Sequence, residues 1–302
     1  MIDIQHVSKS FGAVVALRDV SLRIERGERV AFVGSNGSGK TTLMRSILGL
    51  LRFDGRIAIG GVDVTREPEV ALRSVAYIPQ IAPPLEAPVR EVVRAFASLR
   101  GRDPKDIDER AKRLGLDLEA TAKKRFRDLS GGMKQKLLAA MALSAEADVL
   151  VCDEPTANLD ASARAAFFDA VDARPKGQVV VLCSHRIEEV QQLVDRVIEL
   201  GDGHIERDAT LTDLLSSLRT FRVEVALADG QALAETFLRA NGFESIGRSR
   251  LGALFTQSEK VDVVARLLRE HKDGIVDLSV YQERDLQVAK GPDQKARLEV
   301  VR

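Results

Sequence analysis

Apolar and polar residues alternate along short segments, and these segments are separated by stretches with helical spacing. Residues 2–7 and 20–24 alternate as half-buried strands do. Residues 29–33 form a nearly continuous apolar run that ends at a glycine, which favours a buried central strand. Residues 41–51 then place four apolar side chains on one helical face, namely Leu43, Ile47, Leu48 and Leu51. The pattern predicts a strand, a glycine-rich loop and a helix in succession.

A polar helical stretch follows at residues 89–124, with Val89, Val92, Val93 and Phe96 at helical spacing. Three further strand-like runs come after it, and helical stretches separate them; they lie at residues 149–152, 179–183 and 196–200. Strands that alternate with helices predict a mainly parallel sheet covered on both faces. We therefore expect an α/β domain over residues 1–215, with a helical insertion at about 85–145.

The pattern restarts beyond residues 210–219. A strand is expected at 221–227, a helix at 231–240, two short strands at 244–248 and 253–257 turned at Leu251-Gly252, and a last strand at 276–280. Ser258 can cap the intervening helix, whose expected buried face is Val261, Val264, Ala265 and Leu268. This βαββαβ order predicts a ferredoxin-like α+β module at 218–288. Residues 289–302 are polar, and we expect a flexible tail.

Composition narrows the function classes. The 302 residues carry 45 Lys+Arg and 45 Asp+Glu, and this balance argues against a protein that binds nucleic acid through bulk charge. The two cysteines, Cys152 and Cys183, lie in apolar runs without metal-ligand spacing, so we expect buried thiols in a reducing compartment. No signal peptide is visible at the N-terminus, and no apolar run approaches the ~18 residues that span a bilayer. Any role at a membrane would therefore require a partner.

The glycine-rich loop is the first candidate site. Its residues fit the pattern G-x-x-x-x-G-K-[ST], and they are Gly34, Ser35, Asn36, Gly37, Ser38, Gly39, Lys40 and Thr41. Glycines let successive backbone N–H groups turn toward phosphate oxygens, and the following helix adds its positive N-terminal end. Lys40 supplies a charge for the β and γ phosphates, and Thr41 offers a hydroxyl to Mg²⁺. A chance match arises in about one chain in a hundred of this length, but here the loop also joins a strand to a helix.

A second candidate lies where the run at 149–152 ends in Asp153 and Glu154. Side chains alternate along a strand, so the two carboxylates point to different places. One can face a metal ion while the other faces an attacking water. An acidic strand end without function is the alternative, but phosphoryl transfer needs both a carboxylate for the metal and a group that orients water.

Five further segments give the chain a resemblance to the ABC transporter ATPase family. Leu129-Ser130-Gly131-Gly132-Met133-Lys134-Gln135 resembles its signature motif, and Tyr77-Ile78-Pro79-Gln80 resembles its Q-loop. The other three are Phe11 at the position of an adenine-stacking aromatic, Ala157-Asn158-Leu159-Asp160 as a D-loop, and Ser184-His185 as an H-loop. The resemblance covers residues 1 to about 215. It implies a P-loop ABC ATPase domain with a mixed sheet and a helical insertion.

The resemblance also implies roles for individual residues. Phe11 would stack on adenine, although a plain core aromatic is the alternative. Residues 34–42, which include Thr42, would hold the phosphates of ATP. The Mg²⁺ ion would be held by three residues, Thr41, Gln80 and Asp153. Glu154 would be the general base for the lytic water, and His185 would contact the γ-phosphate.

The resemblance of the signature segment implies a second ATPase subunit. Ser130, Gly131 and Gly132 precede an apolar-faced helix and so offer another N-terminal anion site. In the family this site binds the γ-phosphate of ATP held by a second ATPase subunit, so the resemblance implies an ATP-dependent dimer, here a homodimer. Met133, where the family more often has Gln, resembles ATPases of the ABC-2 exporter type, which often carry a C-terminal extension.

The resemblance implies an ATP-hydrolysing subunit that drives an integral membrane transporter subunit. It also implies that the chain is cytoplasmic, lies on the inner face of the cell membrane and binds no nucleic acid. Three alternatives stay open. The first is the ATPase of the copper-processing ABC system of nitrous oxide reductase maturation. The second is a soluble non-transport ABC protein, against which the single ATPase unit and short insertion speak. The third is a nucleotide-sensing regulator, against which Glu154 and His185 speak.

Overall fold

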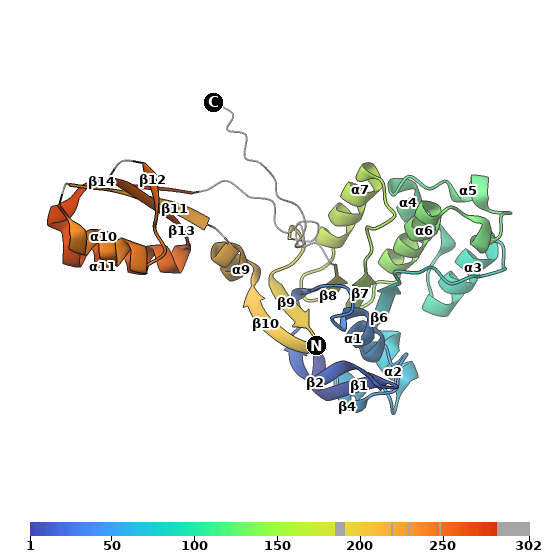
Figure 1. Cartoon of the computed structure of the whole chain (residues 1–302). Helices are drawn as coiled ribbons and strands as arrows, with labels where there is room; N and C mark the ends of the chain where they lie inside the picture. The colour runs from blue at the N-terminus through green and yellow to red at the C-terminus, as the bar shows by residue number, and fades with distance from the viewer. Residues whose placement is uncertain (185–190, 219, 229, 248, 283–302) are drawn as a thin grey trace. The chain divides into compact units, whose positions relative to one another are not determined.

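The computed structural model of the chain describes residues 1–184, 191–218, 220–228, 230–247 and 249–282. The chain divides into two compact units, Met1–Leu211 and Thr212–Arg302, and each of them has its own hydrophobic core. The first unit runs from blue to yellow in Figure 1 and the second is orange to red. The expected combination of an α/β domain with a small α+β domain is confirmed. The expected tail at 289–302 lies outside the described residues.

A six-stranded sheet forms the centre of the first unit, in the order β10-β9-β3-β8-β7-β6. Its strands are β3 (Arg29–Val33), β6 (Val75–Ile78), β7 (Val149–Asp153), β8 (Val179–Cys183), β9 (Arg196–Gly201) and β10 (His204–Thr210). All neighbours are parallel except β10, which runs antiparallel to β9, so the sheet is mixed as expected. Every residue of β7 and β8 is buried, which explains their continuous apolar runs.

An antiparallel sheet in the order β2-β1-β4-β5 lies in the same unit. Its strands are β1 (Ile2–Phe11), β2 (Val14–Ile24), β4 (Asp54–Ile59) and β5 (Val62–Asp63). Helix α1 (Lys40–Ile47) contacts strands of both sheets and buries Leu43, Met44 and Ile47 in the shared core. The helix is shorter than the expected 41–51, because Gly49 adopts a left-handed φ of 64° just beyond its end. A short helix, α2 (Pro68–Arg73), precedes β6.

The expected helical insertion forms a group of helices beside β6 (Figure 1). It comprises α3 (Val89–Arg100), α4 (Pro104–Arg113), α5 (Leu118–Thr121), the 3-10 turn η1 (Phe126–Asp128) and α6 (Gly131–Ser144). Helix α7 (Ala161–Asp172) follows β7. In α3 the residues at helical spacing, Val89, Val93 and Ala97, are buried. The insertion therefore packs through an ordinary amphipathic face.

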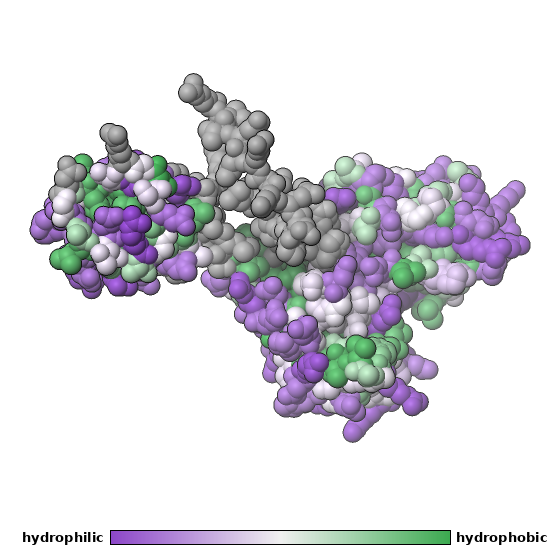
Figure 2. Space-filling model, viewed as in Figure 1, coloured by the Kyte–Doolittle hydropathy of each residue, from purple (hydrophilic) through white to green (hydrophobic). Residues whose placement is uncertain are grey.

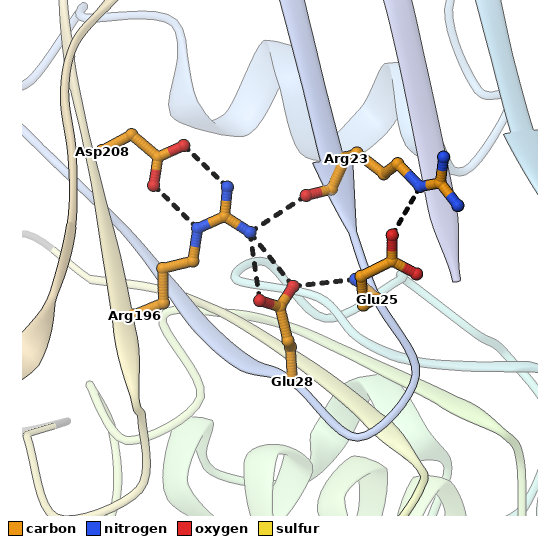
Figure 3. Close-up of polar contacts among 5 residues, drawn as sticks. All are labelled: Arg23, Glu25, Glu28, Arg196 and Asp208. Carbon is orange, nitrogen blue, oxygen red and sulfur yellow. Dashed lines mark hydrogen bonds and ion pairs between the residues drawn. The ribbon is translucent and has the colours of Figure 1, made fainter.

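One arginine ties the two sheets of this unit together (Figure 3). The Arg196 guanidinium on β9 donates two hydrogen bonds of 2.7 Å to the Asp208 carboxylate on β10. It also donates to the Glu28 carboxylate at 3.0 and 3.2 Å and to the Arg23 carbonyl oxygen of β2 at 3.0 Å. Hydrogen bonds to Asp208 raise the pKa of Arg196. Bidentate charge-assisted bonds of this kind orient the strands they join.

The second unit contains a four-stranded antiparallel sheet in the order β12-β13-β11-β14. Its elements are α9 (Leu211–Leu218), which begins at the boundary, β11 (Thr220–Leu227), α10 (Ala232–Ala240), β12 (Glu244–Gly247), β13 (Arg250–Thr256), α11 (Gln257–His271), the 3-10 turn η2 (Lys272–Gly274) and β14 (Ile275–Gln282). This order is that of a ferredoxin-like module. Val223, Val225, Leu238 and Leu267 lie at the centre of its core.

Three details of this module differ from expectation. Leu251 and Gly252 lie inside β13, and the turn before β13 contains Ser249, whose φ is 58°. The N-cap of α11 is Thr256, which forms a capping box with Glu259, so Ser258 is inside the helix. The buried face of α11 is centred on Val263 and Leu267, whereas Val261 and Leu268 are exposed. Val263 and Leu267 are four residues apart and both face the sheet. The buried face of α11 is therefore rotated by about one residue from the expected face.

Most of the surface seen in Figure 2 is hydrophilic, and one compact hydrophobic patch lies over the region of β1 and α2. The abundance of charged residues, 30% of the chain, agrees with this view. Among the residues that the structure describes, no helix has both the length and the apolar character needed to cross a lipid bilayer.

Candidate active site

The loop between β3 and α1 has a backbone that only glycine tolerates at several points. Gly34, Gly37 and Gly39 adopt φ values of 142°, 87° and 105°. A Cβ at Gly34 would lie 2.2 Å from the Leu200 carbonyl oxygen, and one at Gly39 would lie 2.6 Å from that of Ala16. Gly39 caps α1 without a side-chain hydrogen bond, so the first N–H groups of the helix stay available to a ligand.

Lys40 folds back over this loop. Its Nζ donates hydrogen bonds of 2.8 Å to the carbonyl oxygens of Gly34 and Ser35, and it lies 3.5 Å from Ser38 Oγ. The side chain is only 7% exposed, whereas the crest of the loop, residues 35–37, is exposed. Thr41 and Thr42 are half-buried at the start of α1. The Lys40 ammonium group therefore lies against a loop whose backbone N–H groups can bind an anion.

Thr41 and Asp153 meet beneath the loop. The Thr41 hydroxyl donates to Asp153 Oδ1 at 3.5 Å, and Asp153 is fully buried. Its other oxygen, Oδ2, has no hydrogen-bond partner among the described residues. Burial raises the pKa of the Asp153 carboxyl. A buried carboxylate oxygen that lacks a partner and lies beside a hydroxyl fits a hard cation such as Mg²⁺, which takes oxygen ligands.

Glu154 follows Asp153 with an unusual backbone. Its φ is 50°, in the left-handed region, and its N–H donates to the Cys183 carbonyl oxygen at 3.0 Å. A non-glycine residue held in this region costs on the order of 1–2 kcal/mol, and such strain gathers at functional sites. The Glu154 side chain is half-buried directly after the strand that ends at Asp153.

The signature residues begin α6. Ser130 is the N-cap, and its Oγ accepts a hydrogen bond of 3.2 Å from the Met133 N–H. A Cβ at Gly132 would lie 2.9 Å from the Asn158 carbonyl oxygen, so the D-loop backbone packs closely on this glycine. Within the described part of the chain, no hydrogen bond joins residues 130–132 to the phosphate loop. The chain thus carries two separate helix N-termini at glycine-rich segments, that of α1 and that of α6.

Gln135, the last residue of the signature segment, and Lys136, which follows it, fasten α6 to Pro155 and to Asp160 of the D-loop. Gln135 is buried and its Nε2 donates to the Pro155 carbonyl oxygen at 3.1 Å. Lys136 Nζ lies 2.7 Å from Asp160 Oδ2, while Asp160 Oδ1 caps α7 by accepting from the Ala163 N–H. The hydrogen bond from Lys136 lowers the pKa of Asp160. The sequence placed Gln135 in the signature segment and Asp160 in the D-loop segment, but it did not predict these contacts.

Phe11, Gln80 and His185 complete the set of candidates. Phe11 ends β1, and its ring is 48% exposed with Lys9 Nζ 4.9 Å from its centroid, so it is not a core aromatic. Gln80 is exposed just beyond β6, which pairs with β7, so it lies at the edge of the sheet where Asp153 lies. His185 lies outside the described residues.

Known proteins resemble this chain in sequence. The family model described as ABC transporter matches residues 17–157. The daunorubicin resistance ATP-binding protein DrrA3 of Streptomyces coeruleorubidus is 32% identical over 89% of this chain and 88% of its own length. The Nod factor export ATP-binding protein I of Rhizobium etli is 32% identical over 72% of this chain and 70% of its own length. ABC transporter ced-7 of Caenorhabditis elegans is 35% identical, but the chain spans only 12% of its length.

A solved structure resembles it in fold. The post-hydrolysis dimer of the ATP-binding cassette MJ0796, bound to ADP and Pi, has a TM-score of 0.61 and 26% sequence identity. The match covers 70% of this chain and 99% of the cassette. These similarities define a class: the chain belongs to the ABC transporter ATP-binding family. It is an ABC-type ATP hydrolase, and its relatives include exporter and drug-resistance ATPases.

Proposed function

We propose that this chain is the ATP-hydrolysing subunit of an exporter whose membrane-spanning part is a separate polypeptide. Two relatives of similar length support this, one named for Nod factor export and one for daunorubicin resistance. The Met133 form of the signature points the same way. In this proposal the chain is cytoplasmic and lies on the inner face of the cell membrane, attached to its membrane partner.

The observation that carries the proposal is the buried Asp153 carboxylate beneath the glycine loop. Thr41 lies beside it, and Gln80 lies at the same edge of the sheet, so these three residues would hold Mg²⁺. Bound Mg²⁺ would offset charge on the β- and γ-phosphate oxygens. Lys40 would leave the loop carbonyls that it now contacts and pair with the same phosphates. Thr42 and the loop N–H groups would complete the cradle.

Glu154 would take a proton from the attacking water. It directly follows Asp153, the last residue of β7, and its backbone is in the left-handed region. His185 would donate a hydrogen bond to the γ-phosphate, and Phe11, exposed beside Lys9, would stack on the adenine. Each side chain thus has one task in an in-line displacement.

Ser130, Gly131 and Gly132 would bind the γ-phosphate of ATP held by a second copy. Support comes from their place at the N-terminus of α6, a helix of 14 residues, and from their separation from the loop in the same chain. Two copies would then enclose two ATP molecules head to tail, and hydrolysis would release them. Gln135 and the Lys136–Asp160 pair would transmit this event to the D-loop.

Purification of the tagged chain from detergent-solubilised membranes of its own cells tests the proposal. We expect an integral membrane subunit to copurify and the complex to hydrolyse ATP. Glu154→Gln should lower turnover by about 10²–10⁴-fold and leave ATP binding intact, since it removes only the proton acceptor. Glu146→Gln is a matched control, because Glu146 also has a left-handed φ, of 47°, but pairs with Arg102. Full ATPase activity without a membrane subunit, or turnover that survives Glu154→Gln, would contradict the proposal.

A further inference from the structure

Strand β1 carries Val7, Lys9 and Phe11 on one face of its sheet. Side chains alternate along a strand, and each of the two register shifts between β1 and β2 after Val7 adds a residue to β2 and none to β1. Residues 7–11 of β1 therefore alternate without interruption. Val7 is fully buried and Phe11 is exposed, so the half-buried Lys9 lies where the core ends and the surface begins.

The same face of β1 leads to the phosphate loop. Lys9 lies opposite Leu17 of β2, and residues opposite each other in an antiparallel ladder project to the same side of the sheet. Leu17 is fully buried, and a Cβ at Gly39 would lie 3.1 Å from its Cδ2 atom. Lys9 is therefore situated between the loop that would hold the phosphates of ATP and the ring that would stack on its base.

The Lys9 ammonium group contacts the Phe11 ring. Its Nζ atom lies over one face of that ring, 4.9 Å from the centroid, which is the geometry of a cation–π interaction. Within the described ranges no carboxylate forms an ion pair with Lys9, so the ring is the partner of this cation. One face of the half-exposed ring is thus occupied, and the opposite face is the one open to a base.

We propose that Lys9 positions the base of the nucleotide by acting through the Phe11 ring. The inference rests on the stacking role proposed above for Phe11. The ammonium group holds the ring in place before the base arrives, which lowers the ordering cost of binding. The cation also draws the negative charge of the π system toward itself, so the open face repels the π face of a purine less. Lys9 therefore strengthens stacking without contacting the nucleotide itself.

Isothermal titration calorimetry of the full chain with Mg-ADP tests this role. ADP carries the base but lacks the γ-phosphate that hydrolysis and the proposed dimer require. Lys9→Met keeps an unbranched side chain and removes the charge. An exposed cation–π contact changes a binding constant by about two- to fivefold, and we expect binding of Mg-ADP to weaken by this factor. Lys9→Arg should bind as the wild type does, because a guanidinium also stacks on aromatic rings.

Lys176→Met is the matched control for the loss of one positive charge. Lys176 is exposed and precedes β8, whereas the phosphate loop follows β3, which runs parallel to β8. The control position thus lies at the opposite end of the sheet, and its substitution should leave Mg-ADP binding unchanged.

Two further measurements separate an effect through the ring from a direct contact with the phosphates. Phe11→Ala alone should weaken Mg-ADP binding by about fivefold or more, since it removes the stacking partner. In the Phe11→Ala chain, Lys9→Met should have no further effect, because residues that act as one unit are not additive. Magnesium pyrophosphate, which has no base, should bind equally to the wild type and to Lys9→Met.

Full Mg-ADP affinity in Lys9→Met would overturn the proposal, and so would a Lys9→Arg chain that binds no better than Lys9→Met. An effect of Lys9→Met that persists without the Phe11 ring, or that appears with pyrophosphate, would overturn it in favour of a direct phosphate contact. If Phe11→Ala leaves Mg-ADP binding unchanged, the stacking role fails and the inference fails with it. Failure at Lys9 alone would leave the proposed ATPase function intact.

Discussion

The Thr41 hydroxyl lies 3.5 Å from Asp153 Oδ1, although 112 positions separate the two residues in the sequence. This contact joins the start of α1 to the end of β7, two elements packed around the same core. Asp153 Oδ2 has no partner among the described residues. A buried acceptor without a partner is costly in a folded protein, so the site is prepared for a ligand that supplies the missing contact.

Asp153→Asn keeps the shape of this residue and removes its charge. We expect Mg²⁺ to strengthen ATP binding by the wild-type chain and to have little effect on the variant, because an amide is a far weaker ligand for a hard cation. Titration of a fluorescent ATP analogue with Mg²⁺ and with EDTA measures both. Asp172→Asn is the control, since Asp172 pairs with Arg29 at the surface. A variant at position 153 that keeps the full Mg²⁺ effect would contradict the assignment.

Lys40→Ala removes the cation at the mouth of the loop. Charge-assisted hydrogen bonds contribute about 1.5–3 kcal/mol, so ATP binding should weaken by about 10- to 100-fold. Lys40→Arg should not restore it, because a planar guanidinium does not fit where a compact ammonium contacts Gly34 and Ser35. The same titration checks both variants, and wild-type affinity in Lys40→Ala would count against a phosphate role.

Gly132 and Gly131 offer a matched pair within the signature. Gly132→Ala places a methyl group 2.9 Å from the Asn158 carbonyl oxygen, and overpacking of this kind costs about 1–3 kcal/mol. Gly131→Ala makes only an ordinary contact of 3.9 Å with the Asn158 side chain, and alanine is the better helix former. We expect urea unfolding without nucleotide to show a loss of stability for Gly132→Ala alone. Equal losses would mean that the D-loop does not pack on Gly132 as described.

The two thiols should be unreactive in the folded chain. Burial raises the pKa of both Cys152 and Cys183, so the neutral thiol persists as pH rises through the usual cysteine range. We expect no iodoacetamide adduct at pH 8.5 in the native chain and two in urea, counted by mass spectrometry, because the chain has two cysteines. A rapid native adduct would show that β7 or β8 opens to solvent.

Short hydrophobic patterns predicted the elements whose burial depends on only a few consecutive residues. The continuous apolar runs predicted β7 and β8, because a strand buried on both faces has no polar positions. Of the face predicted for α11, Val264 packs against the core, but Val261 and Leu268 are exposed. They are as apolar as the buried Val263 and Leu267, and only tertiary packing selects between the two pairs. Ser258 was predicted as the cap of α11, but Thr256, a residue type that suits the role equally, caps this helix.

The residues of the candidate site also divide into those that the sequence predicted and those that it did not. The glycine loop and the Asp153-Glu154 pair follow from residue types at fixed spacing. The contacts of Gln135 with Pro155 and of Lys136 with Asp160 join segments through the packing of α6, and no spacing rule predicts them. The left-handed backbone of Glu154 was equally invisible in the sequence, because glutamate rarely adopts it.

In the proposed dimer, ATP bound at the loop of one copy contacts Ser130-Gly131-Gly132 of the other, and Glu154 acts on the water that attacks the γ-phosphate. Light scattering after gel filtration of the chain with Glu154→Gln tests this arrangement, because the change blocks the hydrolysis that would release the dimer. We expect this protein to be monomeric alone and dimeric with Mg-ATP, and the further change Ser130→Glu to abolish the dimer while ATP binding persists. A dimer with Mg-ATP that Ser130→Glu leaves intact, or no dimer at saturating Mg-ATP, would contradict the account.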